Sequence, residues 1–128
     1  MVEVEELQGK LIGAEMYIDI GEKAEELQRK IVSLLTKLGF QASPRAEGFA
    51  FFPGEESGWK GLPSIRLTRT RSVLTMMVHA SDTLTAINAG AVNSTPVDVY
   101  QRIMNGMVQV GKLYEEYGKK AAHMEKKM

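Results

Sequence analysis

Apolar and polar residues alternate in the first clear segment of the chain, residues 12–20. The apolar positions are Ile12, Ala14, Met16, Ile18 and Ile20. The polar side carries Glu15, Tyr17 and Asp19. A period of two predicts a β-strand with one buried face and one polar face. Upstream, residues 2–8 fit either a frayed helix or an edge strand.

A period of 3.6 follows over residues 22–38. Its apolar positions are Ala24, Leu27, Ile31, Leu34, Leu35 and Leu38, with charged residues between them. This pattern is typical of an amphipathic helix that covers a core. Gly39 can adopt the left-handed conformation that ends a helix, and Phe40 can fold back on the last turn.

The middle of the chain predicts short strands. After a loop that contains Pro44, residues 48–52 form an aromatic strand, and residues 53–63 form a glycine-rich loop around Trp59. Residues 65–69 and 73–79 are two further strands, joined by a turn or a bulge. Residues 82–92 are ambiguous. Their β-branched residues favour a strand, which we prefer, whereas a cap at Asp82 and a stop at Gly90 would suit a short helix.

The last element is a long helix. Ser94, Thr95 and Pro96 form a strong helix start. We expect the helix to run from Pro96 into the 120s, with residues 123–128 as a frayed tail.

These elements predict a single α+β domain over residues 1–128. The fold class is an antiparallel sheet of four to five strands with two helices packed on one face, in the order β-α-β3/4-α. The order β-α-β4-α is similar to that of the TATA-binding-protein and helix-grip folds. The similarity concerns the order of elements and implies no functional residue.

The long helix carries two apolar stripes, so it is more apolar than a helix with one buried face needs to be. The second stripe needs a partner, either the first helix or a second copy of the chain. Gly106, Gly111 and Gly118 are costly within a helix and indicate a close approach or a bend. With Tyr114 they predict a homo-oligomer, most simply a dimer, formed through this helix. The alternative is a break at Asn105–Gly106.

Composition narrows the function classes. The 128 residues hold 16 basic and 16 acidic side chains, which argues against a globally basic nucleic-acid binder. There is no cysteine and there are two histidines, so we expect no disulfide, metal or other cofactor. The acidic N-terminus is unlike a signal peptide, and no apolar run is long enough for a membrane helix. We therefore expect a cytoplasmic protein without a membrane partner.

Two groups of residues are candidates for chemistry. Glu15, Tyr17 and Asp19 share one strand face, and in one register Thr75, Met77 and His79 lie on the same face of a neighbouring strand, where acid–base chemistry is conceivable. A solvated face is the simpler interpretation. The second group is Arg66, Arg69 and Arg71, which are suited to phosphate or nucleic acid, although Arg66 and Arg69 point to opposite faces of a regular strand.

A ligand pocket is the remaining candidate. Trp59 is either a lid residue or an anchor onto the core. Met77, Met104 and Met107 could line an apolar pocket between sheet and helix, although core filling is the simpler explanation. We therefore predict a non-catalytic binding or assembly module that forms a homo-oligomer. The alternatives are a small-ligand-binding domain and a phosphate- or nucleic-acid-binding domain.

Overall fold

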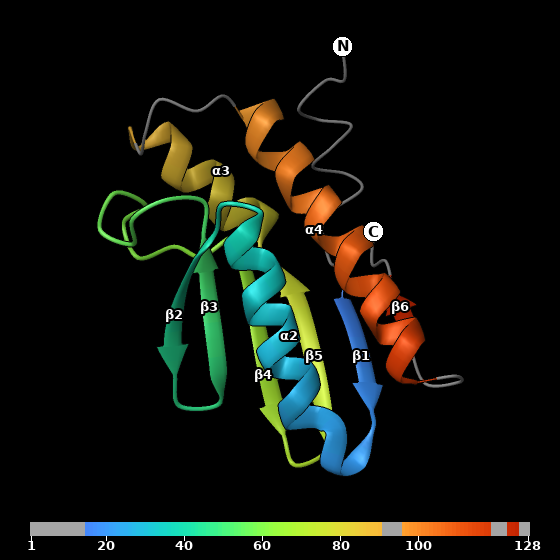
Figure 1. The fold of residues 1–128 in the computed structure, drawn as a ribbon. Coiled ribbons are helices and arrows are strands. Elements are labelled where there is room, and N and C mark those ends of the chain that lie inside the picture. The colour runs from blue at the N-terminus through green and yellow to red at the C-terminus, as the bar shows by residue number, and fades with distance from the viewer. Residues whose placement is uncertain (1–14, 91–95, 119–122, 126–128) are drawn as a thin grey trace.

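The computed structural model describes residues 15–90, 96–118 and 123–125, and it has the predicted α+β architecture (Figure 1). A short 3₁₀ turn, Gly21–Lys23, leads into the first of the three α-helices. The helices are α2 (Ala24–Lys37), α3 (Ala80–Asn88) and α4 (Pro96–Tyr117). The strands are β1 (Glu15–Asp19), β2 (Gln41–Arg45), β3 (Gly48–Phe52), β4 (Ile65–Thr70), β5 (Val73–Val78) and β6 (His123–Glu125).

All strands pair antiparallel in one sheet, in the order β2-β3-β4-β5-β1-β6. Five strands have five or six residues, and the edge strand β6 has three. Glu15 lies opposite Met77, and Tyr17 lies opposite Thr75. The predicted register of these two strands is therefore confirmed, because alternation puts these four residues on one face.

Helix α2 follows directly from its sequence pattern. Its buried residues, Ala24, Leu27, Gln28, Ile31 and Leu35, recur at helical spacing. Gly39 takes a positive φ of 97°. Its N–H donates to the Thr36 carbonyl (3.0 Å), and the Phe40 N–H donates to the Leu35 carbonyl (3.0 Å). These two bonds form the predicted C-terminal cap, in which the chain turns from α2 into β2.

Helices α2 and α4 lie side by side on one face of the sheet, and the core lies beneath them (Figure 1). Val99, Ile103 and Val110 of α4 are fully buried. Tyr100 and Tyr114 are buried as well, and their hydroxyls donate to the carbonyls of Ala80 (2.8 Å) and Leu74 (3.3 Å). These apolar residues of α4 are therefore packed within the chain, and α2 is the helix that packs beside α4. We call the other side of the sheet the open face.

Two predicted elements are wrong. Residues 41–45, predicted as a loop, form the edge strand β2, where Pro44 is tolerated because one side of an edge strand needs no hydrogen bonds. Residues 82–92, predicted as a strand, lie largely in helix α3, which begins at Ala80 and ends at Asn88. The Thr83 and Thr85 hydroxyls donate to the carbonyls of His79 (2.8 Å) and Ser81 (2.9 Å), so both β-branched residues fit into the helix.

The C-terminal region differs from expectation in three respects. Helix α4 continues through Gly106 without a break, and it ends at Tyr117 rather than in the 120s. Gly118 therefore follows the helix instead of lying inside it. Residues 123–125, predicted as part of a frayed tail, pair with β1 as β6. Residues 2–8 and the first positions of the predicted strand, 12–14, lie outside the described residues. Within the described part, no helix combines the length and apolarity needed to cross a membrane.

Candidate functional site

The residues predicted for acid–base chemistry come from two places in the fold, strand β1 and the junction of β5 with α3. Glu15, Tyr17 and Asp19 lie on the open face of β1, and His79 follows β5 at the start of α3. The His79 Nδ1 atom lies 3.7 Å from the Asp82 Oδ2 atom, and the buried Nε2 atom has no hydrogen-bond partner in the described structure. Burial lowers the pKa of His79, the charge of Arg66 lowers it further, and Asp82 opposes both.

Ser64 is the hydroxyl residue next to His79 across the sheet, and it is not placed to act as a nucleophile. The main-chain N–H of His79 donates to the Ser64 carbonyl (2.9 Å). The Ser64 side chain is fully buried, and its oxygen lies 3.0 Å from the Thr83 hydroxyl oxygen. A buried hydroxyl held in this way is out of reach of a substrate, so these residues have a structural role.

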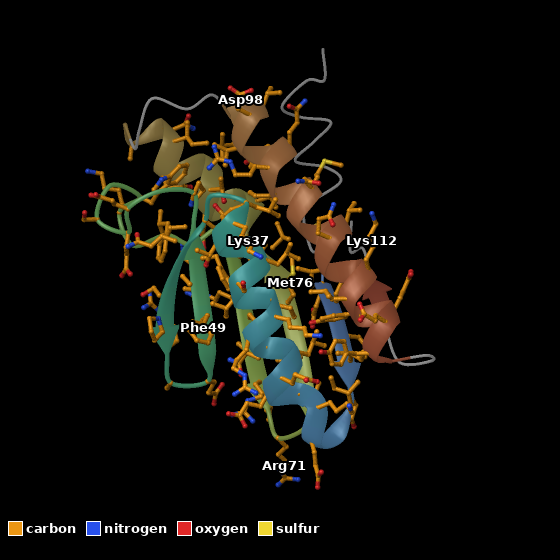
Figure 2. The ribbon with its side chains drawn as sticks, in the orientation of Figure 1. Lys37, Phe49, Arg71, Met76, Asp98 and Lys112 are labelled. Carbon is orange, nitrogen blue, oxygen red and sulfur yellow. The ribbon has the colours of Figure 1, made fainter. Side chains whose placement is uncertain are left out.

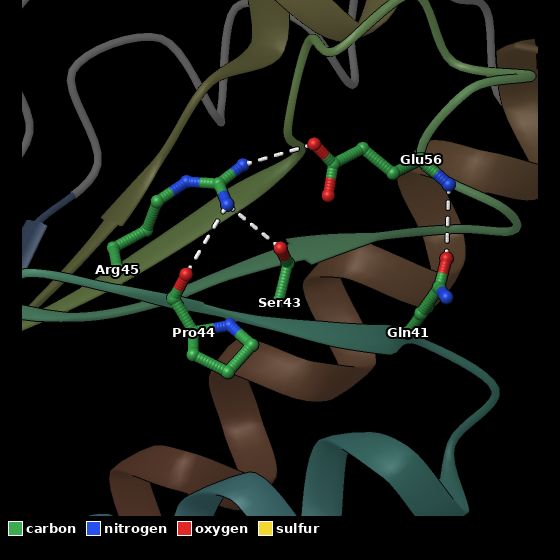
Figure 3. A network of polar contacts seen from close by, with 5 residues as sticks. All are labelled: Gln41, Ser43, Pro44, Arg45 and Glu56. Carbon is green, nitrogen blue, oxygen red and sulfur yellow. Dashed lines mark hydrogen bonds and ion pairs between the residues drawn. The ribbon is translucent and has the colours of Figure 1, made fainter.

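Trp59 is an anchor and not a lid. Its side chain is fully buried, although its Nε1 atom has no hydrogen-bond partner in the described structure. The loop around it is fastened to β2 by Glu56, which appears in Figure 3. The Glu56 Oε2 atom lies 3.4 Å from the Arg45 guanidinium, and the Glu56 N–H donates to the Gln41 side chain (2.9 Å). The Arg45 guanidinium also donates to the Ser43 hydroxyl (2.7 Å) and the Pro44 carbonyl (3.3 Å).

The three methionines predicted to line one pocket lie in different places. Met77 is on the open face of the sheet and is 39% exposed. Met104 and Met107 belong to α4 on the other face, where Met107 is buried in the core and Met104 is half-buried. The sheet therefore separates Met77 from the other two.

The residues predicted as an oligomer interface contact the chain itself. Gly106 lies against Leu35 of α2, and Gly111 lies near Met16 of β1. Tyr114 is fully buried, and the Gly118 N–H donates to the Tyr114 carbonyl (2.9 Å).

The arginines predicted as a phosphate surface point in three directions. Arg66 is on the open face, since it lies opposite Met77. Arg69 lies opposite the buried Leu74, so it is on the helix side. Arg71 is in the β4–β5 turn with a φ of 58° and lies at the tip of the sheet (Figure 2). Because the sheet lies between Arg66 and Arg69, the three do not form one continuous surface.

Arg69 lines a hollow between helix and sheet. The hollow has a volume of about 360 Å³, and we call it the α2–β3 hollow. Its lining residues are Glu25, Gln28, Arg29, Val32, Ser33, Phe49 and Arg69. Phe49 is only partly buried and lies beside α2 on the helix-covered face of the sheet (Figure 2). Phe49 of β3 and Arg69 of β4 thus face the polar edge of α2.

The electrostatics of the hollow are positive and weakly compensated. The Arg69 side chain has no hydrogen bond or ion pair in the described part of the chain, where only its main-chain N–H is bonded, to the Glu47 carbonyl (2.7 Å). Arg29 has Glu25 as a neighbour at 3.9 Å, and the two side chains are 73% and 66% exposed. An ion pair so exposed contributes little and is readily exchanged. Both guanidinium groups are thus available to an anion.

Sequence reasoning found Arg69, missed Arg29 and preferred a core role for Phe49. Arg29 is one of several charged residues on the polar face of α2, and Phe49 reads as core by its aromatic character. Arg29, Phe49 and Arg69 come close together only because of the position of α2 on the sheet. A pattern within one element does not predict that position.

A second hollow, of about 320 Å³, lies on the open face and is lined in part by Arg45 and Arg66. It is less suited to an anion, because Arg45 is already bonded to Glu56, Ser43 and Pro44. Among the described residues there is no group of three or more histidine, cysteine or carboxylate side chains that could hold a metal ion.

The chain was also compared with known proteins. No family model, curated protein or solved structure matches it.

Proposed function

We propose that the protein is a binding module for a small organic anion, which it holds in the α2–β3 hollow. The observation that carries the proposal is the convergence of two arginines, Arg29 and Arg69, on a recess walled by Phe49 and Val32. The sequence suggested a small-ligand pocket lined by methionines as one alternative. The proposed site is a different one, at the outer edge of α2.

The lining side chains favour a ligand with a carboxylate or phosphate group and a flat apolar portion. A guanidinium group presents a planar fork of donors that matches the oxygens of either anion. The Phe49 ring and the Val32 side chain offer an apolar surface that an aromatic or aliphatic body would cover. Gln28 and Ser33 add hydrogen-bonding groups at the helix side. Charge and apolar contact together would distinguish such a ligand from free phosphate.

Self-association and nucleic-acid binding stay predictions of the sequence. For the first, the stripe residues of α4 that suggested an interface are used for packing on α2 and the sheet. For the second, Arg66, Arg69 and Arg71 face different directions. The α2–β3 hollow, in which Arg29 and Arg69 come together, supports the small-ligand proposal.

A titration followed by two-dimensional ¹H–¹⁵N NMR tests the proposal. The probe is phenyl phosphate, with inorganic phosphate and phenol as the two halves of the ligand. We expect phenyl phosphate to shift the amide signals of Val32, Phe49 and Arg69 at lower concentration than either half does. Shifts centred on Arg66 and the open face, or equal responses to phenyl phosphate and inorganic phosphate, would contradict the proposal.

A further inference from the structure

A second surface feature lies on the outer side of the two long helices. A groove of about 320 Å³ runs between α2 and α4, and we call it the α2–α4 groove. Lys30 and Lys37 of α2 and Lys112 of α4 line it, with Leu34 and Leu113 between the helices. Figure 2 shows Lys37 and Lys112 on the two neighbouring helices. The groove and the α2–β3 hollow lie on the two sides of α2, and Ser33 lines both.

Two of the lysines lie on one side of α2. Lys30 and Lys37 are seven residues apart, so they lie on nearly the same face of the helix. At 1.5 Å per residue they are about 11 Å apart along the helix axis, or about two turns. Both can therefore contact one elongated partner.

The groove carries more positive than negative charge. Its lining includes Lys30, Lys37 and Lys112 and one carboxylate, Glu116, which follows Lys112 by one turn of α4. Lys30 lies 4.9 Å above the Tyr117 ring, and Lys37 and Lys112 have no ion pair among the described residues. The groove is therefore net positive.

We propose that the α2–α4 groove is a docking surface for an acidic amphipathic helix of a partner protein. The partly buried Leu34 and Leu113 would receive the apolar residues of that helix, which recur three, four and seven positions apart. Its carboxylates would pair with Lys37 and Lys112 at the rim. Val108 of α4, one turn before Lys112 and 56% exposed, extends the apolar contact beyond the groove.

An anionic membrane is the competing partner for a lysine-lined surface, and the shape of the groove argues against it. Binding in a bilayer interface requires protruding apolar side chains. Among the described residues the exposed large hydrophobic side chains are Val108 and Met77, and Met77 is on the opposite side of the sheet. A membrane would meet lysines and one valine, whereas a helix can reach the recessed leucines.

The test uses the whole chain and a fluorescein-labelled peptide of about 18 residues, or five turns. The peptide has leucine at the i, i+3, i+4 and i+7 positions, with glutamate elsewhere. Fluorescence anisotropy measures its affinity for the wild type and for Lys37→Glu/Lys112→Glu. The control is Lys60→Glu/Arg71→Glu, which has the same net charge and changes exposed residues outside the groove. A scrambled peptide of the same composition controls for unspecific attraction.

We expect Lys37→Glu/Lys112→Glu to weaken binding by about tenfold or more while the control variant stays close to the wild type. The groove variant should in turn prefer a leucine–lysine peptide of the same pattern, and this gain of binding excludes misfolding as the cause. Equal losses in both variants, or equal binding of the scrambled peptide, would overturn the proposal. So would sedimentation with phosphatidylserine vesicles in the absence of peptide binding, which would assign the surface to a membrane.

Discussion

Gly106 of α4 lies so close to Leu35 of α2 that a Cβ atom at Gly106 would approach the Leu35 Cδ2 atom to 3.1 Å. The same Cβ would meet Phe40 at 3.9 Å and Ile65 at 4.0 Å. The two helices thus approach each other closely at Gly106, over the core of one chain. A glycine is unfavourable within a helix, but at position 106 it permits this close packing.

Gly106 and Gly111 should respond oppositely to substitution. Gly106→Leu forces a large side chain between α2 and the sheet, and we expect it to destabilise the fold by about 1–3 kcal/mol. A Cβ at Gly111 would lie 3.7 Å from the Met16 Sδ atom, an ordinary contact. Gly111→Ala should therefore stabilise the fold by up to about 1 kcal/mol through helix propensity. Urea unfolding measures both, and a harmless Gly106→Leu would refute the crossing described above.

The loop around Trp59 should be held by the burial of its ring far more than by its ion pair. Trp59→Ala removes a fully buried ring, and we expect a loss of about 3–5 kcal/mol. Glu56→Gln weakens a pair whose side chains are 45% and 43% exposed, and it should cost less than about 1 kcal/mol. Thermal or urea unfolding compares the two variants. Equal losses would show that the ion pair, and not the ring, holds the loop.

His79 should make the fold sensitive to mild acid. Its pKa is lowered from 6.5 in the folded state, first by burial and then by Arg66. Below about pH 6.5 the unfolded chain therefore takes up the proton before the folded chain does, and stability falls until the pH passes the folded pKa. Each unit of lowering corresponds to about 1.4 kcal/mol.

The measurement is the free energy of unfolding at about pH 7.5 and pH 5 for the wild type and His79→Gln. We expect the wild type to lose more stability on acidification than the variant, because carboxylate effects are common to both. Arg66→Gln should raise the His79 pKa in an NMR titration, since it removes a nearby positive charge. An identical pH dependence in wild type and His79→Gln would contradict the buried, neutral histidine.

The sequence predicted the elements whose patterns are long or strongly periodic. Helix α2 and the shared face of Glu15 and Met77 on neighbouring strands belong to this class, because a slip of one residue would expose the core face. Strand β2 and helix α3 were missed for different reasons. Strand β2 is short, polar and at the sheet edge, so its pattern carries no burial signal. In α3 the β-branched Thr83 is accommodated by a local bond from its hydroxyl to the His79 carbonyl and by a contact with the Ser64 hydroxyl, and Ser64 is 19 residues away in the sequence.

The site was less predictable than the fold. Arg69 was identified by charge, but its grouping with Arg66 and Arg71 assumed that residues close in sequence share a surface. Alternation along β4 separates Arg66 from Arg69, and the residues that join Arg69 come from α2 and β3. The residue pattern along one element cannot predict which residues of other elements lie next to it.

In the proposed site the anion is bound by Arg69 together with Arg29, and not by Arg66 or Arg71. The most direct test is the affinity for phenyl phosphate of Arg69→Gln and Arg66→Gln, which remove the same charge from opposite faces of β4. Isothermal titration or the NMR shifts give the dissociation constants. The account predicts about a tenfold loss or more for Arg69→Gln, as expected for a charge-assisted bond, and a nearly unchanged affinity for Arg66→Gln. Equal losses in the two variants, or a loss in Arg66→Gln alone, would contradict the proposed site.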